Sequence, residues 1–156
     1  MSASISPKIP TGEWTSINEI ETFNLGIQIG NQLSGGEILL LSGSLGAGKT
    51  VLVKGIAHAL NLDEEDVTSP SFTLVNPHQG TLLLYHIDLY RLDQGAAAAH
   101  AVDLDKLLSN EAAVIVIEWA ERMGKYPLPA GSWNISITGE GDEPRIITIQ
   151  PTQKVE

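Results

Sequence analysis

The residues from 43 to 50 have the types and the spacing of a phosphate-binding loop. They are Gly43, Ser44, Leu45, Gly46, Ala47, Gly48, Lys49 and Thr50, which match the pattern G-x-x-x-x-G-K-[ST] at every fixed position. Glycines let the backbone curl so that successive N–H groups point at phosphate oxygens. In this pattern the lysine reaches the β- and γ-phosphates and the threonine hydroxyl binds magnesium. We therefore predict that these eight residues bind a nucleoside triphosphate with Mg²⁺.

Two carboxylates are the candidates for the acidic group that such a site needs. Glu118 follows the apolar run 113–117, and Asp88 follows the run 82–87. Proteins with this type of loop usually hold an acidic residue at the carboxyl end of a neighbouring buried strand. Since an unpaired buried carboxylate is costly, a cation is the expected partner. We predict that both bind metal and that both act in catalysis with Lys49, the alternative being that each side chain simply leaves the core at a strand end.

Other catalytic chemistries find little support in the sequence. The patterns G-x-S-x-G and H-E-x-x-H are absent, and the four histidines have no ligand spacing. His86 lies two residues before Asp88, yet a lone histidine is more often structural. The chain contains no cysteine, which excludes disulfides and thiolate metal sites.

Apolar patterning predicts alternating helices and strands around the loop. The glycine loop should lie between a buried strand and a helix, because a continuous apolar run precedes it and an amphipathic segment follows. An S-x-x-E capping box at Ser16 predicts where the first helix begins. The predicted helices cover 16–33, 52–61 and 102–108, and the predicted strands cover 37–42, 72–76, 81–89, 112–119, 133–137 and 147–149. We predict two hairpins among these strands, one formed by 72–76 with 81–89 and one by 133–137 with 147–149.

Length and charge limit the classes of function. A chain of 156 residues suits one domain, which we place at 15–150, with a flexible leader at 1–14 and a tail at 151–156. No apolar run approaches the ~20 residues that cross a bilayer, so we expect a cytoplasmic protein. The net charge is −10, from nine basic and nineteen acidic residues. Unaided binding of nucleic acid normally needs a basic face, so a partner would have to hold any RNA.

Four motifs in order resemble the TsaE (YjeE) family of small bacterial ATPases. They are the loop 43–50, V-T-S-P-S-F-T-L-V at 67–75, H-I-D-L-Y-R-L at 86–92 and I-E-W-A-E-R at 117–122. The glycine loop alone is common to many families, whereas the other three motifs in this order are far more specific. The resemblance covers about 15–149. It implies a three-layer α/β fold of the P-loop NTPase type, with a mixed central sheet, to which the C-terminal antiparallel hairpin belongs.

The resemblance also implies a function and partners. Members of the family bind and hydrolyse ATP to ADP and act with the TsaB–TsaD complex, which adds a threonylcarbamoyl group to adenosine 37 of tRNA. This chain would then reset or regulate that complex, and it would meet tRNA only through its partners. The same resemblance implies that Glu118 is the acidic residue of the magnesium site and that Asp88 is the essential aspartate near the γ-phosphate.

Three further residues are assigned to the nucleotide site. Thr73 resembles part of a switch segment. Trp119 resembles a residue that lies over the nucleotide or at the partner contact, with plain core packing as the alternative. Arg145 could approach the phosphates or could be a solvated hairpin residue. The chain departs from the family at Ser44, where aspartate is common, and at the alanine-rich stretch 94–100, where an acidic helical stretch is usual.

Two other functions remain open from the sequence. A small-molecule kinase would carry an arginine-rich lid, and with three arginines the chain shows none. A nucleotide-gated binding module would associate with its partner and scarcely hydrolyse ATP. The segment around 15–22 is the candidate for contact with the base.

Overall fold

The apolar run before the glycine loop becomes the central strand of one sheet. The computed structural model describes residues 9–43, 46–63, 75–89, 104–120 and 132–152. Within these ranges seven strands pair in the order β1-β7-β6-β2-β5-β4-β3. Their bounds are β1 Gly12–Ser16, β2 Ile38–Gly43, β3 Val75–Gln79, β4 Leu83–Asp88, β5 Val114–Glu118, β6 Ser132–Thr138 and β7 Arg145–Pro151. Residues 38–41 of β2 are buried, as expected for a strand covered on both faces.

The sheet is mixed. Strand β2 runs parallel to β5 and β6, and β5 runs parallel to β4. Antiparallel strands complete both edges, since β3 pairs with β4 while β6 pairs with β7 and β7 with β1. Both predicted hairpins are therefore present, and residues 72–74 of the first one lie outside the described residues. The carboxyl ends of β2, β4 and β5 meet at one edge because these three strands are parallel.

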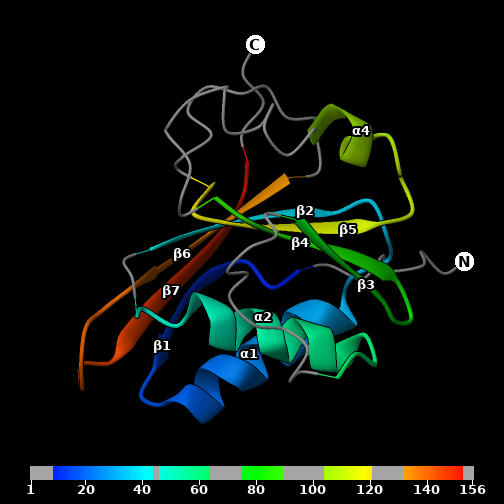
Figure 1. Ribbon diagram of the computed structural model, residues 1–156. Coiled ribbons are helices and arrows are strands. Elements are labelled where there is room, and N and C mark those ends of the chain that lie inside the picture. Colours follow the sequence, from blue (N-terminus) through cyan, green and yellow to red (C-terminus); the bar gives the residue numbers. More distant parts are fainter. Residues whose placement is uncertain (1–8, 44–45, 64–74, 90–103, 121–131, 153–156) are drawn as a thin grey trace, which may run out of the picture.

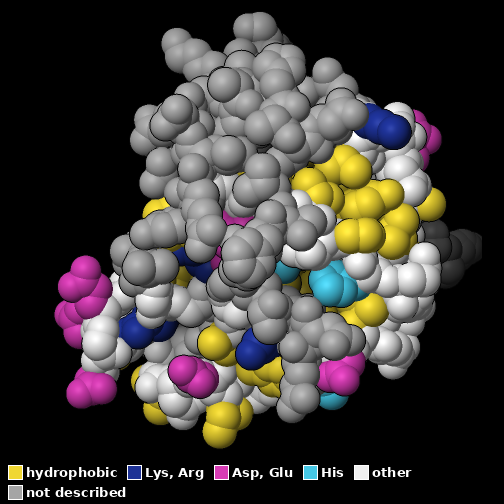
Figure 2. All heavy atoms as spheres, in the orientation of Figure 1, with side chains coloured by type: hydrophobic (Ala, Val, Ile, Leu, Met, Phe, Trp, Pro, Cys, Tyr) yellow, Lys and Arg dark blue, Asp and Glu magenta, His cyan; other side chains and the backbone are white. Residues whose placement is uncertain are grey.

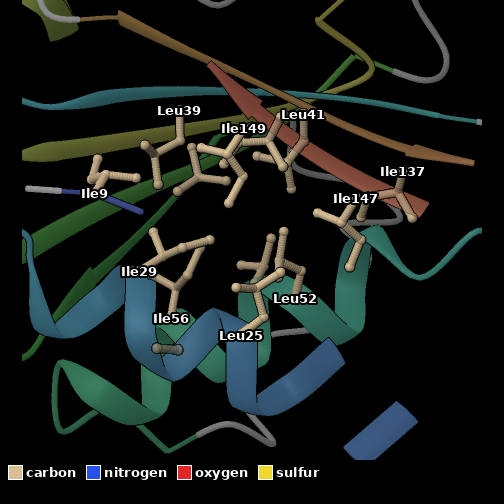
Figure 3. Close-up of a cluster of buried hydrophobic side chains, with 14 of the residues drawn as sticks. Ile9, Leu25, Ile29, Leu39, Leu41, Leu52, Ile56, Ile137, Ile147 and Ile149 are labelled. Carbon is tan, nitrogen blue, oxygen red and sulfur yellow. The ribbon is translucent and has the colours of Figure 1, made fainter. Parts of the chain in front are cut away.

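Helices cover both faces of the sheet (Figure 1). Helices α1 (Glu19–Asn31) and α2 (Lys49–Ala59) lie together on one face, and the short helix α4 (Leu104–Leu108) lies on the other. The larger apolar cluster fills the space between the sheet and the helix pair, with Leu39 and Leu41 facing Ile29 and Ile56 (Figure 3). A smaller cluster contains Leu104 and lies beneath α4. This architecture confirms the predicted three-layer α/β fold with a mixed sheet.

Helices α1 and α2 approach each other closely because glycines line their contact. An added Cβ on Gly26 would lie 2.3 Å from the carbonyl oxygen of Leu52. One on Gly55 would lie 2.1 Å from the carbonyl oxygen of Phe23. No side chain fits at either position without moving a helix. The close contact brings the start of α1 near the start of α2, where the glycine loop ends.

The predictions for the two ends of the domain were wrong in three details. The capping box was expected at Ser16, but the N-cap is Asn18, whose side chain accepts from the Glu21 N–H at 2.9 Å. Ser16 instead ends β1, opposite Arg145 on β7. The predicted leader ended at residue 14, yet β1 begins at Gly12 and Ile9 is buried. The predicted tail began at 151, yet β7 includes Pro151. Pairing between distant strands causes these differences.

Among the described residues, no helix is long and apolar enough to cross a membrane.

Candidate functional site

Two carboxylates and the glycine loop lie at one edge of the sheet. In the strand register Glu118 stands beside Leu41 of β2 on one side and beside Asp88 of β4 on the other. Glu118 is 2% exposed and Asp88 is 9% exposed. Side chains alternate along a strand, so Glu118 shares the face of Val114 and Val116, which pack toward α1 and α2. Both carboxylates therefore face the layer in which α2 begins.

The described part of the glycine loop has a backbone that requires glycine. Gly43 ends β2 with φ of +150°, and an added Cβ there would lie 2.4 Å from the carbonyl oxygen of Ile137. Gly48 is the N-cap of α2, with φ of +112° and no side-chain cap. The N-terminus of α2 directs the positive end of its helix dipole at the loop, and no acidic residue in the first turn neutralises it. Ser44 and Leu45 lie outside the described residues.

Lys49 is held inside the site by a carbonyl and an aromatic ring. It is 5% exposed, and its ammonium donates to the carbonyl oxygen of Gly43 at 2.6 Å. The same ammonium lies 4.0 Å from the centroid of the Trp119 ring, within the range of a cation–π contact. Trp119 has φ of +61°, which is unusual for a bulky residue and concentrates at functional sites. The chain thus turns sharply after Glu118, at the point where the ring meets Lys49.

His86 contacts Glu118 directly, which the sequence reasoning missed. The His86 Nε2 atom forms a short contact with Oε2 of Glu118, and the imidazole is fully buried. Its Nδ1 atom has no hydrogen-bond partner within the described ranges. A usable signal was present in the sequence. Alternation along β4 puts His86 and Asp88 on one face, and a parallel neighbour ending in glutamate would bring a carboxylate to that same face.

Arg145 reaches the glycine loop from β7. Its Nε donates to the carbonyl oxygen of Ala47 at 3.0 Å, and its Nη2 donates to that of Gly46 at 3.4 Å. Nη1 and Nη2 also donate to the carbonyl oxygens of Glu143 and Gly141, at 2.6 and 3.1 Å. Arg145 was predicted either to approach phosphates or to be solvated. In the structure it lies against the backbone of the loop, and its approach to phosphates stays a prediction.

A cleft of about 320 Å³ lies beside the loop, between the start of α1 and the β6–β7 turn. Residues 16–19 and 22, which belong to the segment 15–22 predicted to contact the base, supply one wall. The lining residues are Ser16, Ile17, Asn18, Glu19, Thr22, Gly46, Ala47, Gly48, Val51, Gly141, Asp142, Glu143 and Arg145. Acidic side chains gather at the lower left of Figure 2, over the β6–β7 turn. A volume near 300 Å³ is at the lower end of the range of ligand pockets.

The oxygen donors at the sheet edge suit a magnesium ion. Magnesium prefers oxygen ligands, which the carboxylates of Asp88 and Glu118 and the hydroxyl of Thr50, the second residue of α2, would supply. Within the described ranges no group of three or more His, Cys, Asp or Glu could hold a metal ion. A magnesium ion would therefore take its other ligands from phosphate and water, as it usually does. Thr73, the predicted switch residue, lies outside the described residues.

The fold and the site define the class of the protein. It is a three-layer α/β protein whose central parallel strand leads through a glycine-rich loop into a helix, the arrangement typical of nucleotide-binding α/β proteins. The family model described as "Threonylcarbamoyl adenosine biosynthesis protein TsaE" matches residues 16–147. The chain belongs to the TsaE family, whose members are named for the biosynthesis of threonylcarbamoyladenosine in tRNA.

Similar proteins that carry the TsaE name support this family assignment. The chain is 43% identical over 112 residues to the tRNA threonylcarbamoyladenosine biosynthesis protein TsaE of Mycobacterium tuberculosis, covering 67% of this chain and 66% of that protein. It is 39% identical over 133 residues to TsaE of Treponema pallidum, covering 83% of this chain and 93% of the relative. A crystal structure of YdiB from Bacillus subtilis matches with a TM-score of 0.71 and 31% identity, covering 89% of this chain and 84% of that chain.

Proposed function

We propose that this protein binds ATP with magnesium, hydrolyses it to ADP, and thereby resets or regulates the TsaB–TsaD complex that modifies adenosine 37 of tRNA. One observation carries the proposal: a glycine loop with a buried lysine lies at the same sheet edge as two buried carboxylates, Asp88 and Glu118. Membership of the TsaE family supports the tRNA pathway. The net charge of −10 supports a partner that holds the tRNA.

Each residue of the site has a role in this proposal. The loop backbone and Lys49 hold the phosphates, for which the ammonium leaves the Gly43 carbonyl and the Trp119 ring. Thr50 and Glu118 hold magnesium, directly or through water. Asp88 or Glu118 orients the attacking water. When bound, magnesium neutralises charge that develops on the phosphate oxygens.

The cleft beside the loop is the proposed place of the base. It is continuous with Gly46–Gly48 of the loop, so a nucleotide whose phosphates lie on the loop would extend its base toward the start of α1. The side chains of Asn18, Glu19 and Asp142 supply hydrogen-bond acceptors there, which suit the amino group of adenine.

Slow hydrolysis by the isolated chain is the expected behaviour. An arginine that contacts the transferred phosphoryl is worth about 10³–10⁵ in rate. Arg145 directs its described hydrogen bonds to backbone carbonyls, and the other two arginines lie outside the described residues. We propose that the partner complex completes the site.

Phosphate release with and without TsaB–TsaD tests the proposal. The isolated chain should release phosphate slowly from ATP with no acceptor added, and the complex should accelerate it. Glu118→Gln keeps a hydrogen-bonding side chain beside His86, so it should retain ATP binding and lose hydrolysis. Glu13→Gln, on an exposed position of β1, is the matched control.

Each rival function predicts a different result. Release that depends on an added small-molecule acceptor would support a kinase. ATP-dependent association with TsaB–TsaD and no turnover would support a binding module. Absence of ATP binding would contradict the proposal entirely.

A further inference from the structure

The guanidinium of Arg145 joins two segments through backbone carbonyls. On one side it donates to Gly46 and Ala47 in the glycine loop, and on the other to Gly141 and Glu143 in the β6–β7 turn. Arg145 itself begins β7, which is paired on both sides by β6 and β1. The guanidinium is therefore anchored on a paired strand and reaches the loop across 98 positions of sequence.

These hydrogen bonds set the direction of two peptide planes. In a trans peptide the C=O and the N–H of one unit point in opposite directions. The carbonyl of Gly46 shares its unit with the N–H of Ala47, and the carbonyl of Ala47 shares its unit with the N–H of Gly48. Since Arg145 binds both carbonyls, both N–H groups point away from the guanidinium. In a phosphate-binding loop, N–H groups in these positions must point inward.

Packing does not hold the loop at Gly46, although the next residue, Ala47, is buried in the larger apolar cluster. Gly46 is exposed, and a Cβ added to it would meet no atom within 4 Å. Its φ of +82° is a conformation that glycine adopts freely and can leave freely. Side-chain packing does not orient the peptide plane at Gly46, so the fixed donors of the guanidinium orient it instead.

The charge of Arg145 adds to this effect. Within the described ranges no carboxylate forms an ion pair with Arg145, and the Glu143 side chain instead accepts from the backbone N–H of Glu140 at 3.2 Å. All four hydrogen bonds that the guanidinium donates to described residues therefore go to carbonyl dipoles, and the cation lies directly behind the loop. This favours an anion on the other side of the same peptide planes.

We infer that Arg145 is a positioning residue that orients the N–H groups of Ala47 and Gly48 toward an anionic phosphate group. The inference rests on the proposed nucleotide function. Arg145 touches the loop backbone and acts through it. The β6–β7 turn thereby becomes part of the phosphate site, because its carbonyls fix the other side of the guanidinium.

Nucleotide affinity and amide spectra together test this role. Arg145→Gln should weaken ATP binding about tenfold to a hundredfold, because the N–H groups of Ala47 and Gly48, which would donate to the charged phosphate, lose their fixed orientation. Arg145→Lys keeps the charge but lacks the fork, so it should recover only part of the loss. In ¹H–¹⁵N spectra of the nucleotide-free chain, the signals of Ala47 and Gly48 should shift in both variants. Gln150→Ala, exposed on the same strand, should change neither reading.

The outcomes separate this inference from the proposed function. Unchanged affinity in Arg145→Gln, or weakened affinity with unmoved Ala47 and Gly48 signals, would overturn the positioning role and leave the function standing. Failure of the unaltered chain to bind ATP would overturn both. If the glutamine variant does not fold, the lysine variant alone decides by the same two readings.

Discussion

Removing the imidazole of His86 should destabilise the fold more than removing both members of its pair. His86 is fully buried, and its Nε2 contacts the Glu118 carboxylate, whose side chain is 3% exposed. Within the described ranges no other side chain bonds to that carboxylate. His86→Leu would therefore leave a polar, ionisable group buried without its partner. The double variant His86→Leu/Glu118→Met would replace both groups by apolar side chains of similar size.

The magnitude follows from the burial of both partners. Breaking a buried pair from one side costs about 3–5 kcal/mol. The free energy of unfolding of a typical protein is only about 5–15 kcal/mol. In a protein of this size about 2–4 °C of Tm is lost per kcal/mol, so His86→Leu should lower Tm by roughly 6–20 °C. Replacing both partners can be nearly neutral, so the double variant should lose less than about 2 kcal/mol.

Urea unfolding of four nucleotide-free proteins measures this coupling. They are the unaltered chain, the two single variants and the double variant, followed by circular dichroism with the m-value checked in each. Gln28→Leu, at an exposed position on α1, is the matched control and should change stability by less than about 1 kcal/mol. If the double variant is less stable than His86→Leu, and its loss in the free energy of unfolding equals the sum of the two single losses, the result contradicts a stabilising contact between the two side chains.

Two further predictions concern the helix pair and Lys49. Helix propensity alone predicts that Gly26→Ala stabilises the protein by about 1 kcal/mol. The added Cβ would, however, lie 2.3 Å from the Leu52 carbonyl oxygen, so we expect urea unfolding to show a loss of stability of about 1–3 kcal/mol. The control Gln28→Ala, on the exposed face, should be near neutral, and a stabilised Gly26→Ala would contradict the close helix contact. In a variant whose other two tryptophans are phenylalanine, ATP with magnesium should change the fluorescence of Trp119, because the ammonium 4.0 Å from its ring has to leave. Lys49→Met should already show the altered spectrum without nucleotide, and an unaltered spectrum would count against the contact.

Much of the site could be predicted because each of its parts is a short, continuous stretch of the sequence. The glycine loop, the strand before it and the helix after it are consecutive, so local spacing identifies all three. Glu118 and Asp88 were found because an apolar run that ends in a carboxylate marks the end of a buried strand. The C-terminal hairpin was predicted from alternation around a single turn.

Predictions failed where two local interactions compete. Ser16 and Asn18 are both good helix caps, and the sequence pattern favoured Ser16. In the structure the Ser16 hydroxyl lies 2.7 Å from the Thr22 hydroxyl and donates to the Asn18 carbonyl oxygen at 2.8 Å. Its backbone continues β1 beside β7. Pairing with a strand more than a hundred residues away decided where the helix begins.

The sequence by itself supplied the prediction of which residues bind phosphate and metal, because glycine, lysine, threonine and carboxylates at fixed short spacing have few other uses. The tertiary structure decided which groups support them. His86 meets Glu118 across 32 positions, and Arg145 meets the loop across 98. Such contacts depend on strand order and register, which arise from burying the whole sheet at once. No local pattern records them, since the free energy that selects them is spread over both apolar clusters.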